Sequence, residues 1–152
     1  MPEVLTAKAQ LFSAELEQLP KMLEFIFNSS CCKKFSKKEL GQIELALEEA
    51  CVNITQYAYP RKKGTLKLMY EPTTERPGVK IYIQDWGIPY NPIEEAKKFS
   101  KTQVTQQKKL GGLGVFFIIS LMDNATYIRE HGRNILILTK YLSPQRGHTQ
   151  SI

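Results

Sequence analysis

The sequence lacks any long run of apolar residues. In 152 residues, no apolar stretch approaches the roughly 20 residues that a membrane-spanning helix requires. The first twelve residues, MPEVLTAKAQLF, have neither the charged start nor the apolar centre of an export signal. We therefore expect a cytoplasmic protein that does not contact a membrane.

Cysteine is also scarce. The three cysteines cannot all pair, and Cys31 and Cys32 are neighbours that are poorly placed to bond with each other. No cysteine or histidine spacing matches that of a zinc site. The sequence therefore argues against a disulfide framework and against a structural zinc centre.

Internal repeats and low-complexity segments are absent as well. The apolar share of 42% is ordinary for a folded domain and too high for a disordered chain. A chain of this length suffices for one core. We expect a single domain over residues 1–142, followed by a flexible tail over residues 143–152.

Acidic residues are outnumbered, which gives a formal net charge of +6 and an isoelectric point near 9.2. The basic residues are spread over four segments, CCKKFSKK, YPRKKG, EEAKKFSK and QQKKLGG, and do not follow one helix. This distribution does not favour direct binding of nucleic acid. It fits a solvated surface, affinity for nucleotide phosphates, or an acidic protein partner.

The first half of the chain predicts one strand and two helices. Residues 4–12 alternate like an edge strand, and residues 14–28 have helical apolar spacing with Ser13 as a candidate N-cap. Pro20 indicates that the regular part of this helix begins there. Ser36 and Glu39 fit a capping box for a second helix, which Pro60 ends.

The second half predicts two hairpins separated by a loop and a helix. TLKLMY and VKIYIQD alternate with period two, as do ATYIRE and NILILTKYL near the end. Between them lie an irregular stretch over residues 87–112, with a helical turn near 94–99, and an apolar helix over 112–123. The predicted fold class is α+β: a two-layer sandwich with helices on one face of a mixed, mainly antiparallel sheet.

Three short segments are candidates for a site. On the second helix, Glu49 and Asn53 are four positions apart and share a face. Asp85 ends a strand and is followed two positions later by Gly87. The helix over 112–123 opens on a run of glycines, where free backbone amides favour an anion. Taken singly, each segment also has a purely structural explanation: polar residues on the surface, a turn at the end of a strand, or a hinge between a loop and a helix.

Taken together and in this order, the segments resemble the GHKL superfamily of ATPases over roughly residues 5–142. EEACVNITQYAYP and GGLGVFFIISLMDNATYIREHGRNILILTKYL are similar, more narrowly, to the anti-sigma-factor serine/threonine kinases of bacterial partner-switching systems. Tyr57 stands where many of these kinases have histidine, and Asn134 lies where a Gly-Thr or Gly-Asn pair is frequent. The resemblance implies ATP and Mg²⁺ as cofactors.

The resemblance also implies a role for each site residue. Asn53 corresponds to the Mg²⁺ ligand and Glu49 to the general base that activates the attacking hydroxyl. Asp85 corresponds to the acceptor of the adenine amino group, and Gly87 to a position that leaves room for the base. The phosphate-side turn corresponds to Gly111, Gly112, Leu113 and Gly114. The segment from Glu94 to Leu110 corresponds to a lid with five lysines, namely Lys97, Lys98, Lys101, Lys108 and Lys109.

The implied function is phosphorylation of a STAS-type antagonist protein and inhibition of a sigma factor, with a homodimer as a further expectation. An alternative is a nucleotide-dependent binding switch with little or no kinase activity, against which Glu49 argues. A sensor histidine kinase fits less well, because the two histidines, His131 and His148, lie in a predicted turn and in the tail.

Overall fold

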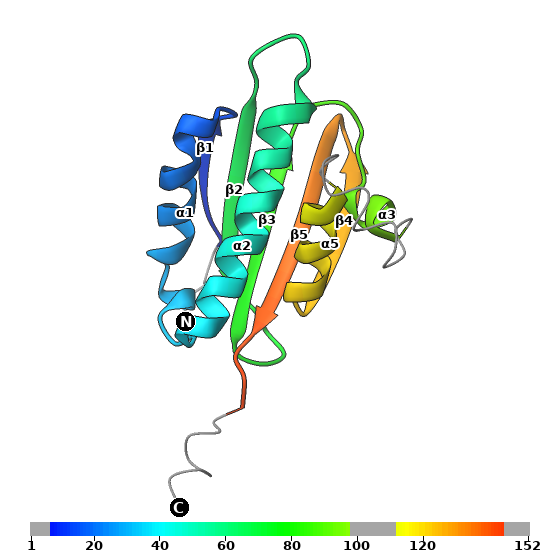
Figure 1. Ribbon diagram of the computed structural model, residues 1–152. Helices are drawn as coiled ribbons and strands as arrows, with labels where there is room; N and C mark the ends of the chain where they lie inside the picture. Colours follow the sequence, from blue (N-terminus) through cyan, green and yellow to red (C-terminus); the bar gives the residue numbers. More distant parts are fainter. Residues whose placement is uncertain (1–6, 98–111, 145–152) are drawn as a thin grey trace, which may run out of the picture.

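The computed structural model describes residues 7–97 and 112–144, which form one sheet covered on one face by helices (Figure 1). The strands are β1 (Lys8–Ser13), β2 (Thr65–Pro72), β3 (Gly78–Asp85), β4 (Asn124–Glu130) and β5 (Arg133–Tyr141). Their order across the sheet is β1-β2-β3-β5-β4, and all four pairings are antiparallel. The predicted α+β class is confirmed, and no parallel pairing occurs among the described strands.

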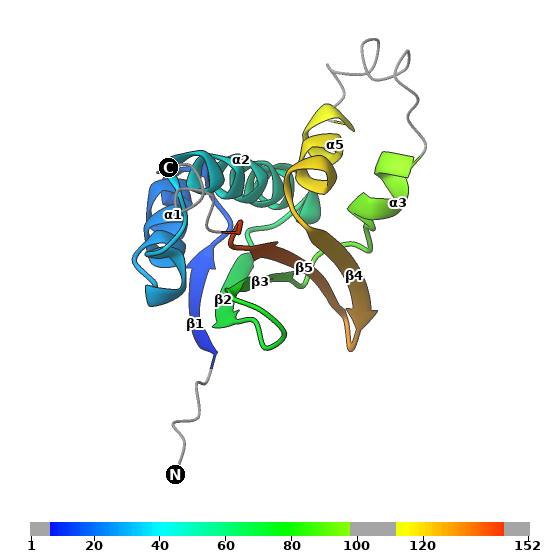
Figure 2. The ribbon, with the colours of Figure 1, turned by 90° about the horizontal axis from the view of Figure 1, so that it is seen from below.

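Three helices cover the sheet: α1 (Leu19–Phe27), α2 (Lys37–Asn53) and α5 (Gly112–Leu121). Figure 2 shows all three on the same side, with the other face of the sheet left open. A shorter helix, α3 (Pro92–Lys97), contacts α5 and β4. Short helical turns occupy Leu16–Gln18 and Ser30–Cys32, and a π-helical turn spans Ile54–Ala58.

The core lies between the helices and the covered face of the sheet. Because side chains alternate along a strand, the register places Leu68, Ile83 and Leu136 in one buried row across β2, β3 and β5. Helix α2 presses Ile43 and Leu47 onto this face, and both are fully buried. The apolar side chains that alternate along the strands therefore pack with those on one face of α2 to form a single core.

The start of the first helix differs from the prediction. Ser13 belongs to β1 and does not cap a helix, because a short 3₁₀ turn with Glu15 at its N-cap comes first. The regular helix α1 begins at Leu19 with Pro20 in its first turn, as the proline indicated. Residues 4–6 of the predicted first strand lie outside the described residues.

The capping box at the start of α2 is confirmed. The backbone N–H of Glu39 donates to Ser36 Oγ at 3.1 Å, and the backbone N–H of Ser36 donates to Glu39 Oε1 at 2.9 Å. Two amides that the helix leaves without partners are thereby satisfied. This cap fixes the residue at which α2 starts. It therefore helps to determine which residues form the last turns of the helix.

Helix α2 changes at Asn53 into the π-helical turn, which contacts the loop after β3. The backbone N–H of Ile88 donates to the carbonyl oxygen of Ala58 at 3.1 Å. The hydroxyl of Tyr59 accepts from the backbone N–H of Trp86 at 2.8 Å and donates to the carbonyl oxygen of Thr65. The bonds from Ile88 and Trp86 join two segments that are 27 or more residues apart in the sequence. No helix within the described ranges is long and apolar enough to span a membrane.

Candidate functional site

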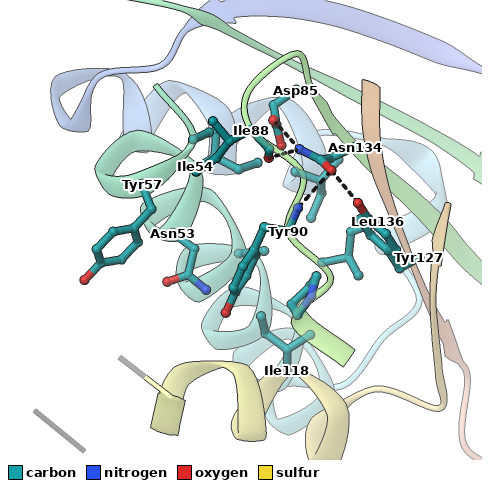
Figure 3. A pocket seen from close by; sticks show the side chains of 14 residues that line it. Asn53, Ile54, Tyr57, Asp85, Ile88, Tyr90, Ile118, Tyr127, Asn134 and Leu136 are labelled. Atoms are coloured by element: carbon teal, nitrogen blue, oxygen red, sulfur yellow. Dashed lines mark hydrogen bonds between the residues drawn. The ribbon is translucent and has the colours of Figure 1, made fainter. Parts of the chain in front are cut away.

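A pocket lies where the end of α2, the loop after β3, the start of β5 and helix α5 meet (Figure 3). It contains about 570 Å³ of empty space, counting its open mouth. Its walls are mainly apolar, with Ile54, Ile83, Ile118 and Leu136 among them, and its polar residues include Asn53, Asp85 and Asn134. Apolar walls with a few converging polar groups are typical of a small-molecule site.

Asp85 is the buried acid of this pocket, with 5% of its surface exposed. Its Oδ1 accepts from Asn134 Nδ2 at 2.9 Å and from the backbone N–H of Gly87 at 2.8 Å. Both bonds go to the same oxygen, so Oδ2 is left to accept a hydrogen bond from a bound molecule. This geometry suits recognition of an amino group.

Burial raises the pKa of Asp85 above its usual value. The hydrogen bonds from Asn134 and Gly87 and the positive charge of Arg129 act in the opposite direction and offset part of this shift. Arg129 is held nearby, because its guanidinium donates to the carbonyl oxygen of Gly87 at 3.0 Å. The carboxylate is therefore buried and still supplied with donors that favour its charged form.

Asn134 is the centre of the polar network in the pocket. Besides Asp85, its Nδ2 donates to the carbonyl oxygen of Ile88 at 2.8 Å, and its Oδ1 accepts from the backbone N–H of Tyr90 at 3.3 Å and from the hydroxyl of Tyr127. Figure 3 shows these bonds converging on its amide. Asn134 thus fixes both the acid and the loop beside it.

Tyr127 is a pocket residue that the sequence pattern did not indicate, whereas Asn134 is one that it did. Tyr127 lies on the pocket side of β4, and its partner in the β4–β5 register is Leu136, another residue of the pocket wall. The alternation of ATYIRE places Tyr127 on the covered face of the sheet. However, only the pairing of β4 with β5 brings it to Asn134.

Asn53 and Glu49 both belong to the last two turns of α2. The side chain of Asn53 lines the pocket, as does Tyr57 one turn later. Glu49 is half-buried and lies against the first turn of α5. The predicted shared face is therefore the face that α2 turns toward α5.

Gly114 is the point at which α5 meets Glu49. A Cβ built on Gly114 would stand 2.1 Å from Glu49 Oε1, which is far closer than any side chain permits. The carboxylate occupies the space that a side chain at position 114 would fill. The glycine is thus needed to place the acid beside the start of α5.

Gly87 lies tightly against the π-helical turn that follows α2. A Cβ on Gly87 would meet the carbonyl oxygen of Ala58 at 2.2 Å and the Cβ of Ala58 at 2.6 Å. Its missing side chain therefore makes room for the π-helical turn that follows α2.

The rest of the predicted phosphate side is described only in part. Gly112 is the first residue of α5 and Leu113 follows it, whereas Gly111 lies outside the described residues. The predicted lid is described only to Lys97, the exposed last residue of α3. The other lid lysines lie outside the described ranges: Lys98, Lys101, Lys108 and Lys109.

Comparison with known proteins identifies the family of the chain. Residues 12–140 match the family described as "Histidine kinase-like ATPase domain". The chain belongs to this family. The match extends over both hairpins and both helices of the pocket, so the resemblance noted in the sequence is confirmed at the level of the domain.

Relatives of this histidine kinase-like domain include two proteins named serine-protein kinase RsbW. The protein of Bacillus mycoides (strain KBAB4) is 25% identical over 115 residues, which cover 74% of this chain and 70% of the relative. The protein of Bacillus cereus (strain AH187) is 24% identical over a region of the same extent. The names of these relatives support an ATPase or kinase activity and do not specify its substrate protein.

The residues present fit a purine nucleotide with its metal ion. Asp85 offers an acceptor at the closed end of an apolar pocket, and Asn53 offers an amide oxygen, a hard ligand of the kind that Mg²⁺ prefers. The glycine-rich start of α5 offers the N-terminus of a helix of ten residues.

Proposed function

We propose that this chain is an ATP-dependent serine/threonine protein kinase and an anti-sigma factor of a bacterial partner-switching system. Its substrate is a STAS-type antagonist protein, and it acts in the cytoplasm. The observation that supports this most directly is the pocket that contains Asp85 and Asn53, with Glu49 one helical turn before Asn53 and against the start of α5. Membership of the histidine kinase-like family and the relatives named as kinases support it further.

Each residue has one task in the proposed reaction. ATP supplies the transferred phosphoryl group, and Mg²⁺ neutralises the charge of its phosphates. Asp85 Oδ2 accepts the hydrogen bond of the adenine amino group, and Asn53 provides an oxygen ligand for the metal ion. Glu49 would accept the proton of the serine or threonine hydroxyl as the hydroxyl oxygen bonds to phosphorus and the bond between that phosphorus and the oxygen of the leaving ADP breaks.

The first turn of α5 supports the phosphates. Gly112, Leu113 and Gly114 present backbone amides there, and Gly111 precedes them. Gly87 leaves room for the base beside Asp85, and it also lets the π-helical turn after α2 approach the loop that follows Asp85. Phosphoryl transfer needs mainly such positioning and charge stabilisation, which a single general base can complete.

The switch itself follows from competition for one surface. The unmodified antagonist holds the kinase, and its phosphorylation places a phosphate in that interface, which weakens it and frees the kinase to bind the sigma factor. A homodimer is part of the proposal. Direct contacts with nucleic acid or a membrane are not.

Mass spectrometry tests the kinase activity. The chain is incubated with Mg-ATP and candidate STAS proteins, and the substrate should gain the mass of one phosphate. Glu49→Ala should abolish the gain while ATP binding survives, because the base is lost and the pocket is kept. Glu48→Ala is the matched control, since Glu48 is a half-buried acid of the same helix that does not contact Gly114.

The outcomes separate the two functions considered. Phosphorylation undiminished by Glu49→Ala would remove Glu49 from the role of base. ATP binding that alters partner choice without any phosphate transfer would instead identify a nucleotide-dependent binding switch. A pull-down with and without ATP would then show which partner is held in each state.

A further inference from the structure

A second cleft lies at the opposite end of α2 from the nucleotide pocket. Figure 1 shows the start of α2 and the end of β5 at this end of the molecule. Four basic residues line the cleft, namely Lys34, Lys38, Arg76 and Lys140, and we refer to it as the basic cleft. It contains about 1350 Å³ of empty space, counting its open mouth.

Lys140 is a buried cation without a charged partner. It is 8% exposed, and its Nζ donates to Gln42 Oε1 and to the carbonyl oxygen of Leu121, each at 2.8 Å. No carboxylate of the described residues pairs with it. The amide oxygen is neutral, and the carbonyl at the end of α5 carries only a partial negative charge.

The surroundings of Lys140 favour the binding of an anion beside its ammonium group. A buried charge is costly unless it is paired, and an ammonium group has three hydrogens to donate, of which two are used here. Lys140 faces the empty space of the basic cleft. An oxyanion bound there would accept the third hydrogen and balance the charge.

The two acids of the basic cleft are already bound to protein donors. Glu39 accepts from the backbone N–H of Ser36 and from the backbone N–H and hydroxyl of Ser143. Burial raises the pKa of Glu39, but these hydrogen bonds outweigh burial and hold it below its usual value. Asp123 accepts from the backbone N–H of Tyr141 at 2.7 Å. Four cations against two acids leave the cleft net positive.

The cations come from separate segments and extend from the floor to the rim. Lys34 and Lys38 are exposed on either side of the start of α2, and Arg76 comes from the turn between β2 and β3. The Arg76 guanidinium stacks over the Tyr141 ring at 4.3 Å from the centroid, which orients it. One small anion could reach only part of this set.

We propose that the basic cleft binds an acidic segment of a partner protein. One carboxylate of the segment pairs with Lys140, and others, spaced along the peptide, pair with Arg76 and the two rim lysines. The cations are few and come from separate segments, which suits carboxylates spaced along a peptide better than the continuous phosphate backbone of a nucleic acid. The site is separate from the nucleotide pocket and extends the activity proposed above.

Fluorescence anisotropy with a labelled hexaglutamate peptide tests this site on the full chain. The titration is run with saturating Mg-ADP, so that the peptide does not occupy the nucleotide pocket. We expect binding that weakens with salt and an increase in Kd of about tenfold for Lys140→Gln. Lys67→Gln, on the open face of the sheet, removes the same charge and should change the Kd less than about twofold.

A second variant guards against a folding defect in Lys140→Gln. The double variant Lys34→Gln/Lys38→Gln alters only exposed side chains and should also weaken the peptide several-fold. Equal losses in the Lys67 and Lys140 variants, or no binding of hexaglutamate, would overturn the proposal. Displacement of the peptide by inorganic phosphate at low concentration, or by a DNA oligonucleotide, would overturn it as well, since the site would then serve another ligand.

Discussion

At the scale of single residues, the pocket depends on which oxygen of Asp85 is already bonded. Two protein donors share Oδ1, and the acid is 5% exposed, so the remaining oxygen has a defined direction and few competitors from solvent. Asn134 enforces this choice, because its amide also holds the loop at Ile88 and Tyr90. Specificity for a base would thus depend on one carboxylate and one amide.

Asp85→Asn should weaken ATP, because the charged acceptor for the amino group is lost. Hydrogen bonds to charged groups contribute about 1.5–3 kcal/mol, so the Kd should rise roughly 10- to 150-fold by calorimetry. The unmodified chain should discriminate against GTP, whose base offers an oxygen in place of the amino group. Equal affinity for ATP and GTP would contradict the assignment.

The pH dependence of adenosine binding follows from the raised pKa of Asp85. Affinity should fall as the pH drops through this pKa, since the protonated acid loses its charge, and the fall should begin above the range of an ordinary aspartate. Asn134→Ala removes a donor that lowers the pKa, so it should move the midpoint to higher pH. Adenosine is used because it has no titrating phosphate, and Asp85→Asn should abolish the transition.

Gly114→Ala should slow phosphoryl transfer more than it weakens ATP. The new methyl group would collide with Glu49 Oε1, and a displacement of the base by about 1 Å can cost up to 100-fold in rate. Gly41→Ala is the matched control, since it lies in α2 with open space around it and should leave the rate unchanged. A rate unaffected by Gly114→Ala would show that the position of the Glu49 carboxylate does not control the rate of phosphoryl transfer.

At the scale of elements, α2 links the two ends of the molecule. Its capped start contributes Glu39 to the basic cleft, and its last turns contribute Asn53 to the pocket beside β3 and Glu49 to the contact with α5. The π-helical turn that follows brings Ala58 against Gly87, and π-helical turns often occur at functional sites. The length and the two ends of this one helix therefore set the geometry of both sites.

Ser36→Ala should lower the free energy of unfolding by about 0.5–2 kcal/mol, because the N-cap of α2 loses its acceptor. Chemical denaturation measures this change directly. ATP affinity, measured under conditions in which the variant stays folded, should hardly change, since Asn53 lies at the other end of the helix. Ser30→Ala removes an exposed hydroxyl as the control, and an equal effect of both variants would argue against the cap.

At the scale of the whole molecule, the segment after β5 closes the fold. Leu142 donates its backbone N–H to the carbonyl oxygen of Pro77 at 2.9 Å, and Ser143 donates to Glu39 at 2.9 Å. These bonds tie the end of the last strand to the β2–β3 turn and to α2. The proposed domain boundary at residue 142 therefore lies next to a residue that still bonds to the domain.

A chain that ends at Pro144 should unfold at the same temperature as the full chain and bind ATP equally well. Adding Ser143→Ala to that shorter chain should lower the free energy of unfolding by about 1 kcal/mol, the value of one hydrogen bond. Differential scanning calorimetry measures both. Loss of nucleotide binding in the chain ending at Pro144 would show that the domain extends further.

Much of the fold could be predicted because its signals are local. The alternation of TLKLMY and VKIYIQD, the Ser36–Glu39 cap and Pro20 act within a few residues, and the structure agrees at each of them. Ser13 failed as a cap because the edge strand β1, held by its pairing with β2, extends over it. Pairing with a strand more than 50 positions away outweighed a local preference.

The sequence by itself determined the elements, their order and the residue types of the site, since these follow from periodicity, capping and spacing along the chain. Only the tertiary structure decided what those residues touch. It placed Gly87 against Ala58, Gly114 against Glu49 and Asn134 beside Asp85. It also buried Lys140 with no acid of the described residues paired with it. The reason is physical, because such contacts depend on distances between segments that no local pattern specifies.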